Sequence, residues 1–325
     1  MVNRGATLLL MLAASTAAAA SGPLVIAHRG ASGYRPEHTL ESYRLAIEMG
    51  ADFIEPDLVP TKDGVLIARH ENEIGSTTDV AARFPDRKRT KTVDGQSLTG
   101  WFTEDFTLAE IKTLRARERL AFRSHTYDGQ FAVPTFDEVI DLAQRMGEAR
   151  RRPVGVYPET KHPTYFRALS LAIEEKLLES LQRHGWNDRA APVFIQSFEQ
   201  ENLRQLRKKT TVRLIQLVNT PAMIEGDGLK SIATYADGIG PEKRLLIPVN
   251  PDGSLAPPTD LVARAHALNL LVHVWTVRTE TDFLPAGYHG NVTAEFEALR
   301  RLGVDGVFTD FPDLGVKAYA ASESR

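Results

Sequence analysis

Short apolar runs rich in β-branched residues alternate along the chain with longer amphipathic stretches. The apolar runs lie at 24–28, 52–58, 65–70, 154–159, 193–198, 212–218, 236–240, 270–277 and 304–309. The helix-like stretches lie at 39–49, 135–146, 164–184, 199–209, 258–268 and 294–302. A strand followed by a helix, repeated to the end of the chain, is typical of a parallel sheet covered by helices. We therefore expect an α/β fold.

Such repeats form either an open doubly wound sheet or a closed barrel. The first apolar run is followed by HRGASGY, and not by the spaced triple-glycine turn into a helix that marks a dinucleotide-binding sheet. We therefore expect a (β/α)8 TIM-like barrel. The next helix has start and stop signals of its own, with Thr39 as the N-cap candidate and Gly50 directly after its last apolar position.

Residues 71–134 interrupt the alternation. The stretch is rich in Asp, Arg, Lys and Thr, and its one clear helical pattern lies at 107–117. Without it and the N-terminal leader, the remaining length is close to the ~250 residues typical of a (β/α)8 barrel. We therefore expect a small inserted subdomain over about 71–134, on the face where catalytic loops gather. A surface excursion without fixed structure is the alternative.

The second and third apolar runs are too close together for a parallel connection. The linker between them contains Asp63-Gly64, a strong signal for a two-residue hairpin turn, so we expect the two runs to pair antiparallel. Such a turn places His70 opposite Asp57, and a small change of register places it opposite Glu55. Either register sets a histidine beside a carboxylate.

The first twenty residues do not belong to the repeat. Arg4, the apolar run at 8–14 and the small residues at 18–20 form the pattern of a secretory signal peptide. A membrane anchor is the alternative, but the apolar run is shorter than the roughly 20 residues that a span needs. We expect a signal peptide over 1–20, a folded domain over 21–325, and export to the periplasm or cell envelope.

Composition restricts the partners. The chain has no cysteine, which excludes disulfides and thiolate metal sites, and its net charge of −3 gives no electrostatic basis for binding nucleic acid. No further apolar run is long enough to span a bilayer, so we expect no stable membrane insertion. The oligomeric state is not indicated by any feature of the sequence.

Three carboxylates stand where strands are expected to end. Glu55 and Asp57 are two residues apart on one strand and therefore share a face, and Glu159 ends a later strand. In a barrel these ends meet at one mouth, where oxygen ligands of this kind suit a hard divalent cation. Arg29 and Lys161 add two fixed positive groups, so that the site is suited to a bound phosphate. A structural Ca²⁺ site without a catalytic role is the alternative.

Two histidines complete the candidate site. Hydrolysis of a phosphodiester needs one group to activate the nucleophile and another to protonate the leaving alkoxide, and His28 and His70 can divide these tasks. Phe198 and Trp275 also end strands, so they either line the mouth or pack against the barrel wall. His273 is expected inside the barrel, and no partner can be assigned to the other histidines.

Taken in order, the motifs resemble the glycerophosphodiester phosphodiesterase family. They are HRG…PEHT, GADFIEPDL, TKDG-x-LIARHE, PE-x-K, QSF, VWTV and DGVFTDFPD, and they run from about residue 24 to 316. The leader and the 71–134 stretch are similar to the exported bacterial members. The resemblance implies a barrel with a small inserted subdomain, and hydrolysis of glycerophosphodiesters to sn-glycerol 3-phosphate and an alcohol.

The resemblance also implies roles for the site residues. His28 and His70 match the acid/base pair, and Arg29 and Lys161 match the phosphate contacts. The metal ligands are matched by Glu55, Asp57 and Glu159. The exported members are similar in favouring Ca²⁺, with Mg²⁺ as the alternative used by other branches.

Two positions depart from the family pattern. His38 stands where the family motif P-E-N-T has an amide, which can change the contacts near Arg29. Glu71 stands where the family motif H-D has an aspartate, which can change the orientation of His70. Two other functions compete with that of a glycerophosphodiester phosphodiesterase. One is a phospholipase D-like or phosphoinositide-specific lipase on the same barrel, and the other is a Ca²⁺-dependent protein that binds phosphodiesters without cleaving them.

Overall fold

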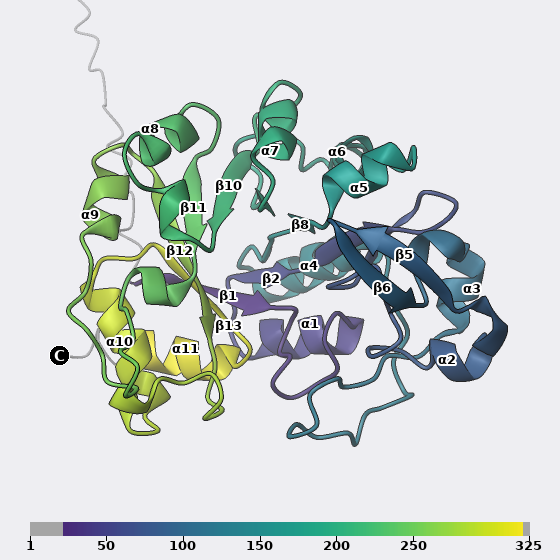
Figure 1. The fold of residues 1–325 in the computed structure, drawn as a ribbon, viewed down its shortest axis with the longest axis horizontal. Helices are drawn as coiled ribbons and strands as arrows, with labels where there is room; N and C mark the ends of the chain where they lie inside the picture. Colours follow the sequence, from purple (N-terminus) through teal and green to yellow (C-terminus); the bar gives the residue numbers. More distant parts are fainter. Residues whose placement is uncertain (1–21, 321–325) are drawn as a thin grey trace, which may run out of the picture.

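All nine predicted apolar runs form strands, and these strands join into one curled sheet (Figure 1). The computed structural model describes residues 22–320, so the predicted signal peptide over 1–20 lies outside the described residues. The strands of this sheet are β1 (Leu24–His28), β2 (Phe53–Glu55), β3 (Asp57–Pro60), β4 (Leu66–Ala68), β7 (Gly155–Val156), β8 (Glu159–Thr160), β9 (Phe194–Ser197), β10 (Arg213–Val218), β11 (Gly238–Pro241), β12 (Leu271–Val277) and β13 (Gly306–Thr309).

Eleven strands arise from nine runs because prolines divide two of them. Pro56 separates β2 from β3, and Pro158 lies between β7 and β8, where the missing N–H interrupts the ladder. β2 pairs with β7 and β3 pairs with β8, and the order continues from β8 through β9, β10, β11, β12 and β13 back to β1. The result is a curled, barrel-like α/β sheet, parallel except at β4.

The helices lie around this sheet (Figure 1). They are α1 (Leu40–Glu48), α2 (Val80–Arg83), α3 (Leu108–Thr113), α4 (Phe136–Arg150), α5 (Pro163–Ala168), α6 (Ile173–Arg183), α7 (Gln200–Arg207), α8 (Gly228–Ala233), α9 (Leu261–His266), α10 (Val292–Arg301) and α11 (Pro312–Ala320). The single helix expected over 164–184 is two helices, because the backbone turns at Ser170, where φ is 60°. As predicted, the Thr39 side chain accepts the Ser42 N–H at the start of α1. None of the helices formed by the described residues combines the length and the apolar character needed to cross a bilayer.

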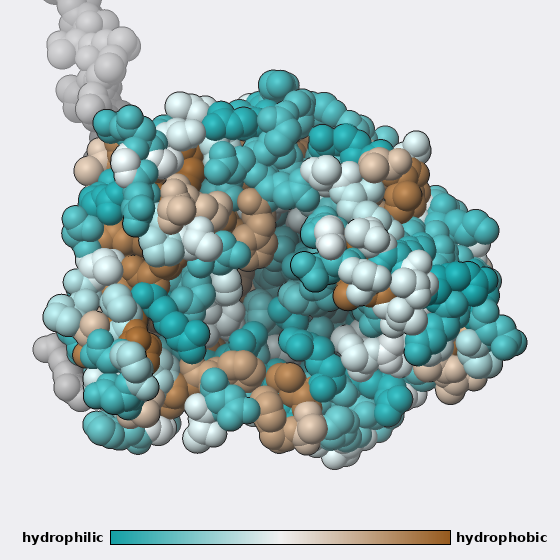
Figure 2. Space-filling model, viewed as in Figure 1, coloured by the Kyte–Doolittle hydropathy of each residue, from teal (hydrophilic) through white to brown (hydrophobic). Residues whose placement is uncertain are grey.

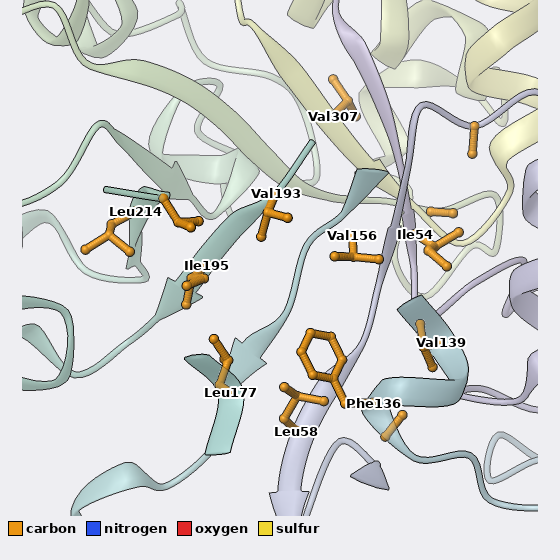
Figure 3. Packing of buried hydrophobic residues seen from close by; sticks show 14 of the residues in the cluster. Ile54, Leu58, Phe136, Val139, Val156, Leu177, Val193, Ile195, Leu214 and Val307 are labelled. Atoms are coloured by element: carbon orange, nitrogen blue, oxygen red, sulfur yellow. The ribbon is translucent and has the colours of Figure 1, made fainter. Parts of the chain in front are cut away.

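Alternate residues of the strands face two separate apolar clusters. Figure 3 shows part of the outer cluster, where Ile54 of β2 packs with Phe136 and Val139 of α4. The inner cluster fills the space enclosed by the sheet and consists of Ile26, Phe53, Tyr157, Phe194, Ile215 and Phe308. Because Phe53 and Glu55 share a face, the strand that fills the interior also delivers a carboxylate to its rim.

Between β4 and α4 the chain forms defined elements instead of an excursion without structure. β5 (Arg89–Val93) and β6 (Gln96–Gly100) pair antiparallel as a two-stranded sheet of their own. Helices α2 and α3 also lie in this stretch, and α3 falls within the helical pattern predicted at 107–117. This stretch is called the 71–134 segment below.

The antiparallel hairpin β3–β4 is confirmed, but its predicted register is wrong. Leu58 lies opposite Ala68 and Pro60 opposite Leu66, so the same ladder extended by two residues would set His70 opposite Pro56 and not opposite a carboxylate.

The turn has three residues instead of two. Thr61 pairs with Val65, because the Thr61 N–H donates to the Val65 carbonyl at 2.9 Å, and the Gly64 N–H donates to the Thr61 carbonyl at 2.9 Å. Gly64 has a φ of +77°, the left-handed geometry that closes a three-residue hairpin loop. The Asp63-Gly64 pair therefore predicts the position of the turn correctly, but the predicted length of two residues is wrong.

Gly30, two residues after the end of β1, should not tolerate a side chain. It has a φ of +86°, and a Cβ added there would lie 2.7 Å from the Ser42 carbonyl carbon. Left-handed strain alone costs about 1–3 kcal/mol. Gly30→Ala should therefore reduce the free energy of unfolding by more than Gly64→Ala, where φ is +77° and no atom lies within 4 Å. Urea unfolding of both variants measures the difference, and equal losses would contradict the role of the contact.

Candidate functional site

Strand register brings the predicted site residues to one level. His28 of β1 is the register partner of Glu55, and Asp57 of β3 is the partner of Glu159 on β8. Glu159 in turn lies beside Gln196 of β9. These positions are at the carboxyl ends of parallel strands, where barrel enzymes carry their active sites.

The pocket at this level contains almost every residue predicted for the site. Figure 2 shows a hollow in the middle of this face of the molecule. The pocket is lined by His28, Arg29, Glu55, His70, Glu159, Lys161, Phe198 and Trp275 from the predicted set, and by Gln196, Leu217, Thr276 and Phe308 in addition. Asp57 lies behind the surface of the pocket, buried beside Glu159.

Three buried carboxylates form a cluster suited to a divalent cation. One oxygen from each of Glu55, Asp57 and Glu159 lies within 4.8 Å of the others. The Glu55 oxygens accept the Arg29 N–H at 2.8 Å and the Gln196 side-chain amide at 3.0 Å. Asp57 Oδ1, by contrast, is buried and has no hydrogen-bond donor among the described residues. Oxygen donors of this kind, with one left unsatisfied, fit Ca²⁺ or Mg²⁺.

The crowding of these acids shifts their pKa values in opposite directions. Burial raises the pKa of Glu55 well above its usual range, and the negative charges of Asp57 and Glu159 raise it further. Burial and Asp57 likewise raise the pKa of Glu159 to about 8, against the opposing effect of Lys161. For Asp57 the raising effect of burial is outweighed by Lys161 and His38, so its pKa lies well below its usual range. A bound cation would therefore displace protons from this cluster.

Two cations lie beside different carboxylates of the cluster. Arg29 is buried with its Nη1 3.0 Å from Glu37 and its Nε 3.5 Å from Asp57. Lys161 is also buried, with Nζ 3.0 Å from Glu159 Oε1. Although burial opposes their charge, the surrounding carboxylates raise the pKa of both groups, so both stay charged. Fixed cations at a pocket suit a phosphate anion.

His28 forms a dyad with a carboxylate that the sequence analysis did not identify. Its Nδ1 lies 2.6 Å from Asp310 Oδ1, and Asp310 follows β13, which pairs with β1. The second Asp310 oxygen accepts from Arg123 Nη2 at 2.6 Å and from Arg278 Nε at 2.7 Å. Burial lowers the pKa of His28 to about 3, and Arg29 adds to this effect against Asp310. The bond to Asp310 leaves Nε2 as the nitrogen available to a ligand.

His70 has a comparable partner. Its Nδ1 lies 2.9 Å from Glu71 Oε1, so the residue that departs from the usual H-D motif still reaches the histidine. Burial lowers the pKa of His70 to about 4, and Arg29 and Lys161 contribute to the shift. Both histidines are therefore neutral at pH 7 in the absence of a ligand.

Several other placements differ from the expectations. His38, which had no assigned partner, is fully buried between Asp57 Oδ2 at 2.9 Å and the Tyr43 hydroxyl at 2.7 Å. A buried histidine next to a metal-suited acid could have been anticipated only from the departure in PEHT. His273 lies inside the sheet as predicted, with its Nδ1 2.8 Å from the Tyr157 hydroxyl.

The aromatic wall of the pocket is formed by two predicted residues. The rings of Phe198 and Trp275 meet edge to face with centroids 5.8 Å apart. Trp275 Nε1 donates to the Gly240 carbonyl at 2.6 Å, which fixes the indole where it lines the pocket. Phe198 and Trp275 therefore line the mouth, as the first of the two alternatives proposed.

A cation-suited carboxylate cluster between two histidines and two fixed positive groups, on a curled α/β sheet, defines a site for phosphate esters. The family model for the glycerophosphoryl diester phosphodiesterase family matches residues 28–314, and the chain belongs to this family. It is 41% identical over 318 residues to a glycerophosphodiester phosphodiesterase of Arabidopsis thaliana, covering 90% of this chain and 84% of the relative. It is 32% identical over 338 residues to one of Haemophilus influenzae, covering 91% and 90%.

Solved structures agree on the fold. A putative glycerophosphoryl diester phosphodiesterase of Silicibacter pomeroyi superposes with a TM-score of 0.67 at 22% identity, covering 93% of this chain and 94% of that chain. A phosphodiesterase of Oleispira antarctica, solved in complex with the product sn-glycerol-3-phosphate, has a TM-score of 0.67 at 21% identity, covering 92% and 97%.

Asp310→Asn tests the buried ion pairs around His28. Burial alone would raise the pKa of Asp310, but Arg278 and His28 hold it well below its usual range. A carboxylate of lowered pKa stabilises the fold fully above its unfolded pKa, and this contribution is lost as the pH falls toward the folded pKa. The variant should lose about 3 kcal/mol of unfolding free energy at pH 7, because two arginines lose a buried partner.

At pH 3 the difference between wild type and Asp310→Asn should be smaller by about 1 kcal/mol, since each pKa unit is worth about 1.4 kcal/mol. Urea unfolding at both pH values measures it, with the exposed Asp252→Asn as control. A difference that is equal at the two pH values would show that Asp310 is not held ionised by its partners.

Proposed function

We propose that this protein hydrolyses glycerophosphodiesters to sn-glycerol 3-phosphate and an alcohol, in a reaction that depends on a divalent cation and two histidines. The observation that carries the proposal is the cluster of Glu55, Asp57 and Glu159 at the carboxyl ends of paired strands, at a pocket that His28 and His70 also line. The relatives that bear this enzyme name, and the product complex of the Oleispira antarctica enzyme, support the choice of substrate.

The three carboxylates would hold Ca²⁺, with Mg²⁺ as the alternative. When bound, the cation supplies Lewis-acid stabilisation of the negative charge on the phosphoryl oxygens. Arg29 and Lys161 bind the remaining phosphate oxygens. Phe198 and Trp275 bound the space for the organic part of the substrate.

The histidines transfer the protons. With Nδ1 bound to Asp310 or Glu71, each histidine presents Nε2 toward the ligand, one as the base for the attacking hydroxyl and the other as the acid for the leaving alkoxide. The attacking oxygen is either water or the neighbouring hydroxyl of the glycerol. The second route expels the alcohol and forms a cyclic phosphate, which water then opens to sn-glycerol 3-phosphate. The geometry is compatible with His28 as the base and His70 as the acid, and equally with the reverse.

The main test is release of sn-glycerol 3-phosphate from glycerophosphocholine by the purified protein. We expect release, its loss in EDTA, and its return with added Ca²⁺ or Mg²⁺. Cleavage of lysophospholipid in a parallel assay would instead indicate a lipase. Binding of glycerophosphocholine without turnover would indicate a phosphodiester-binding protein. Absence of release with either metal would overturn the proposed function.

Replacement of the histidines should separate chemistry from metal binding. His28→Ala and His70→Ala should each lower kcat by 10²-fold or more, the contribution typical of a general acid or base. The rise in Tm on adding Ca²⁺ should persist in both variants and disappear in Glu159→Gln, which removes a carboxylate of the cluster. Full kcat in a histidine variant would exclude that residue as acid or base.

The exported, periplasmic branch of the family is part of the same proposal. It is supported by the apolar run at 8–14 and the small residues at 18–20. Expression of the full chain in a bacterium and N-terminal sequencing of the product should give a start at or close to Ser21, and an intact Met1 in the soluble fraction would overturn it.

A further inference from the structure

A chain of close polar contacts leads from His70 through Glu71 and His162 to the β5–β6 hairpin. Glu71 Oε1 binds His70 Nδ1 at 2.9 Å, and Glu71 Oε2 binds His162 Nε2 at 2.8 Å. His162 Nδ1 in turn lies 2.6 Å from Asp94 Oδ2. The chain therefore runs from a candidate catalytic residue through β8 and α5 to the tip of the β5–β6 hairpin, which Figure 1 places beside them.

The pattern of donors and acceptors fixes the protonation along this chain. A carboxylate accepts hydrogen bonds, so both nitrogens of His162 must carry protons to donate to Glu71 and Asp94 together. Burial opposes the charge of His162, but the two carboxylates outweigh it and raise its pKa. Glu71 stays ionised between two histidines, because their hydrogen bonds lower its pKa against the effect of burial. An ionised Glu71 can accept only from a protonated Nδ1 of His70.

The backbone at both outer residues is built for this contact. Asp94 and Gly95 form the turn of the hairpin with φ of 46° and 79°, the two positive values of a type I′ turn. His162 has a φ of 48° at the start of α5, directly after Lys161. Apart from Glu71 and Asp94, the charged groups beside His162 are Glu159, Lys161 and Glu199, which line the same pocket. The hairpin thus ends at a histidine that holds Glu71.

We propose that His162 and Asp94 are positioning residues that, through Glu71, hold His70 in the tautomer with hydrogen on Nδ1 and Nε2 free toward the substrate. The proposal rests on the proposed function for its effect on turnover, while the tautomer itself is a property of the free protein. It makes the tip of the 71–134 segment a part of the active site that does not touch the substrate.

The first test uses turnover of glycerophosphocholine. His162→Asn keeps a residue that tolerates positive φ but is too short to reach both carboxylates. It should lower kcat about tenfold or more with little change in KM, a loss typical of removing the outer partner of an active-site group. Asp94→Asn keeps the turn, because Asn-Gly favours the same type I′ geometry as Asp-Gly, and should give a smaller loss of the same kind. The matched control is His125→Asn, since His125 forms a comparable exposed pair with Asp128 at 2.9 Å.

Two further readouts distinguish positioning from loosened structure. The double variant Asp94→Asn/His162→Asn should lose no more activity than His162→Asn alone, because both changes break one chain. Removal of the His162 charge leaves Glu71 fully negative beside His70, so the limb of the pH profile that reports His70 should move to higher pH. Additive losses with an unchanged pH profile would overturn the proposal.

The second test does not depend on activity. Side-chain ¹⁵N NMR of histidine-labelled protein near pH 7.5 should show His70 protonated on Nδ1 and His162 protonated on both nitrogens. In His162→Asn the His70 signals should move toward a mixture of tautomers. A wild-type His70 protonated on Nε2, or a neutral His162, would overturn the proposal even if glycerophosphocholine proves not to be a substrate. Inactive wild-type protein with the expected signals would count against the proposed function alone.

Discussion

Three carboxylates that share one buried level are the constraint around which this site is built. Glu55, Asp57 and Glu159 cannot all be ionised at such short range without positive charge or hydrogen-bond donors. The fold supplies Arg29 and Lys161 as fixed cations, and the raised pKa of Glu55 and Glu159 shows that these do not suffice. A divalent cation would neutralise the remaining negative charge, so the repulsion that raises these pKa values would also favour the binding of a metal.

The two histidines at the rim are each held by a carboxylate, and the groups that hold the two carboxylates differ. Each has its Nδ1 bound by a carboxylate and thus presents Nε2 to the pocket. Asp310 is held by two arginines, whereas Glu71 is held by His162. A carboxylate that is itself bound cannot rotate away from the histidine, so the outer cation would contribute to the geometry of the proposed proton transfer without taking part in it.

Local spacing predicted the centre of the site, and long-range pairing decided its surroundings. The two-residue interval between Glu55 and Asp57 and the strand ends at His28 and Glu159 can be read along the chain, because strand periodicity and barrel order determine where they point. Asp310 could not be assigned in this way, since it lies 282 residues from its partner His28. The register of β3–β4 failed for a related reason, as one extra turn residue changes every pairing and cannot be distinguished from the Asp-Gly signal alone.

The 71–134 segment acts on the site through carboxylates and not through the pocket itself. Its Arg123 reaches Asp310 at 2.6 Å and its Arg119 reaches Glu37, the partner of Arg29, at 2.9 Å. Together with Asp94, these contacts mean that one segment supports both candidate proton-transfer groups and one phosphate contact from outside. Because the support is indirect, substitutions in this segment should alter the alignment of the reacting groups more than they alter substrate binding. The segment contributes no strand to the main sheet, but the proposed chemistry depends on its contacts.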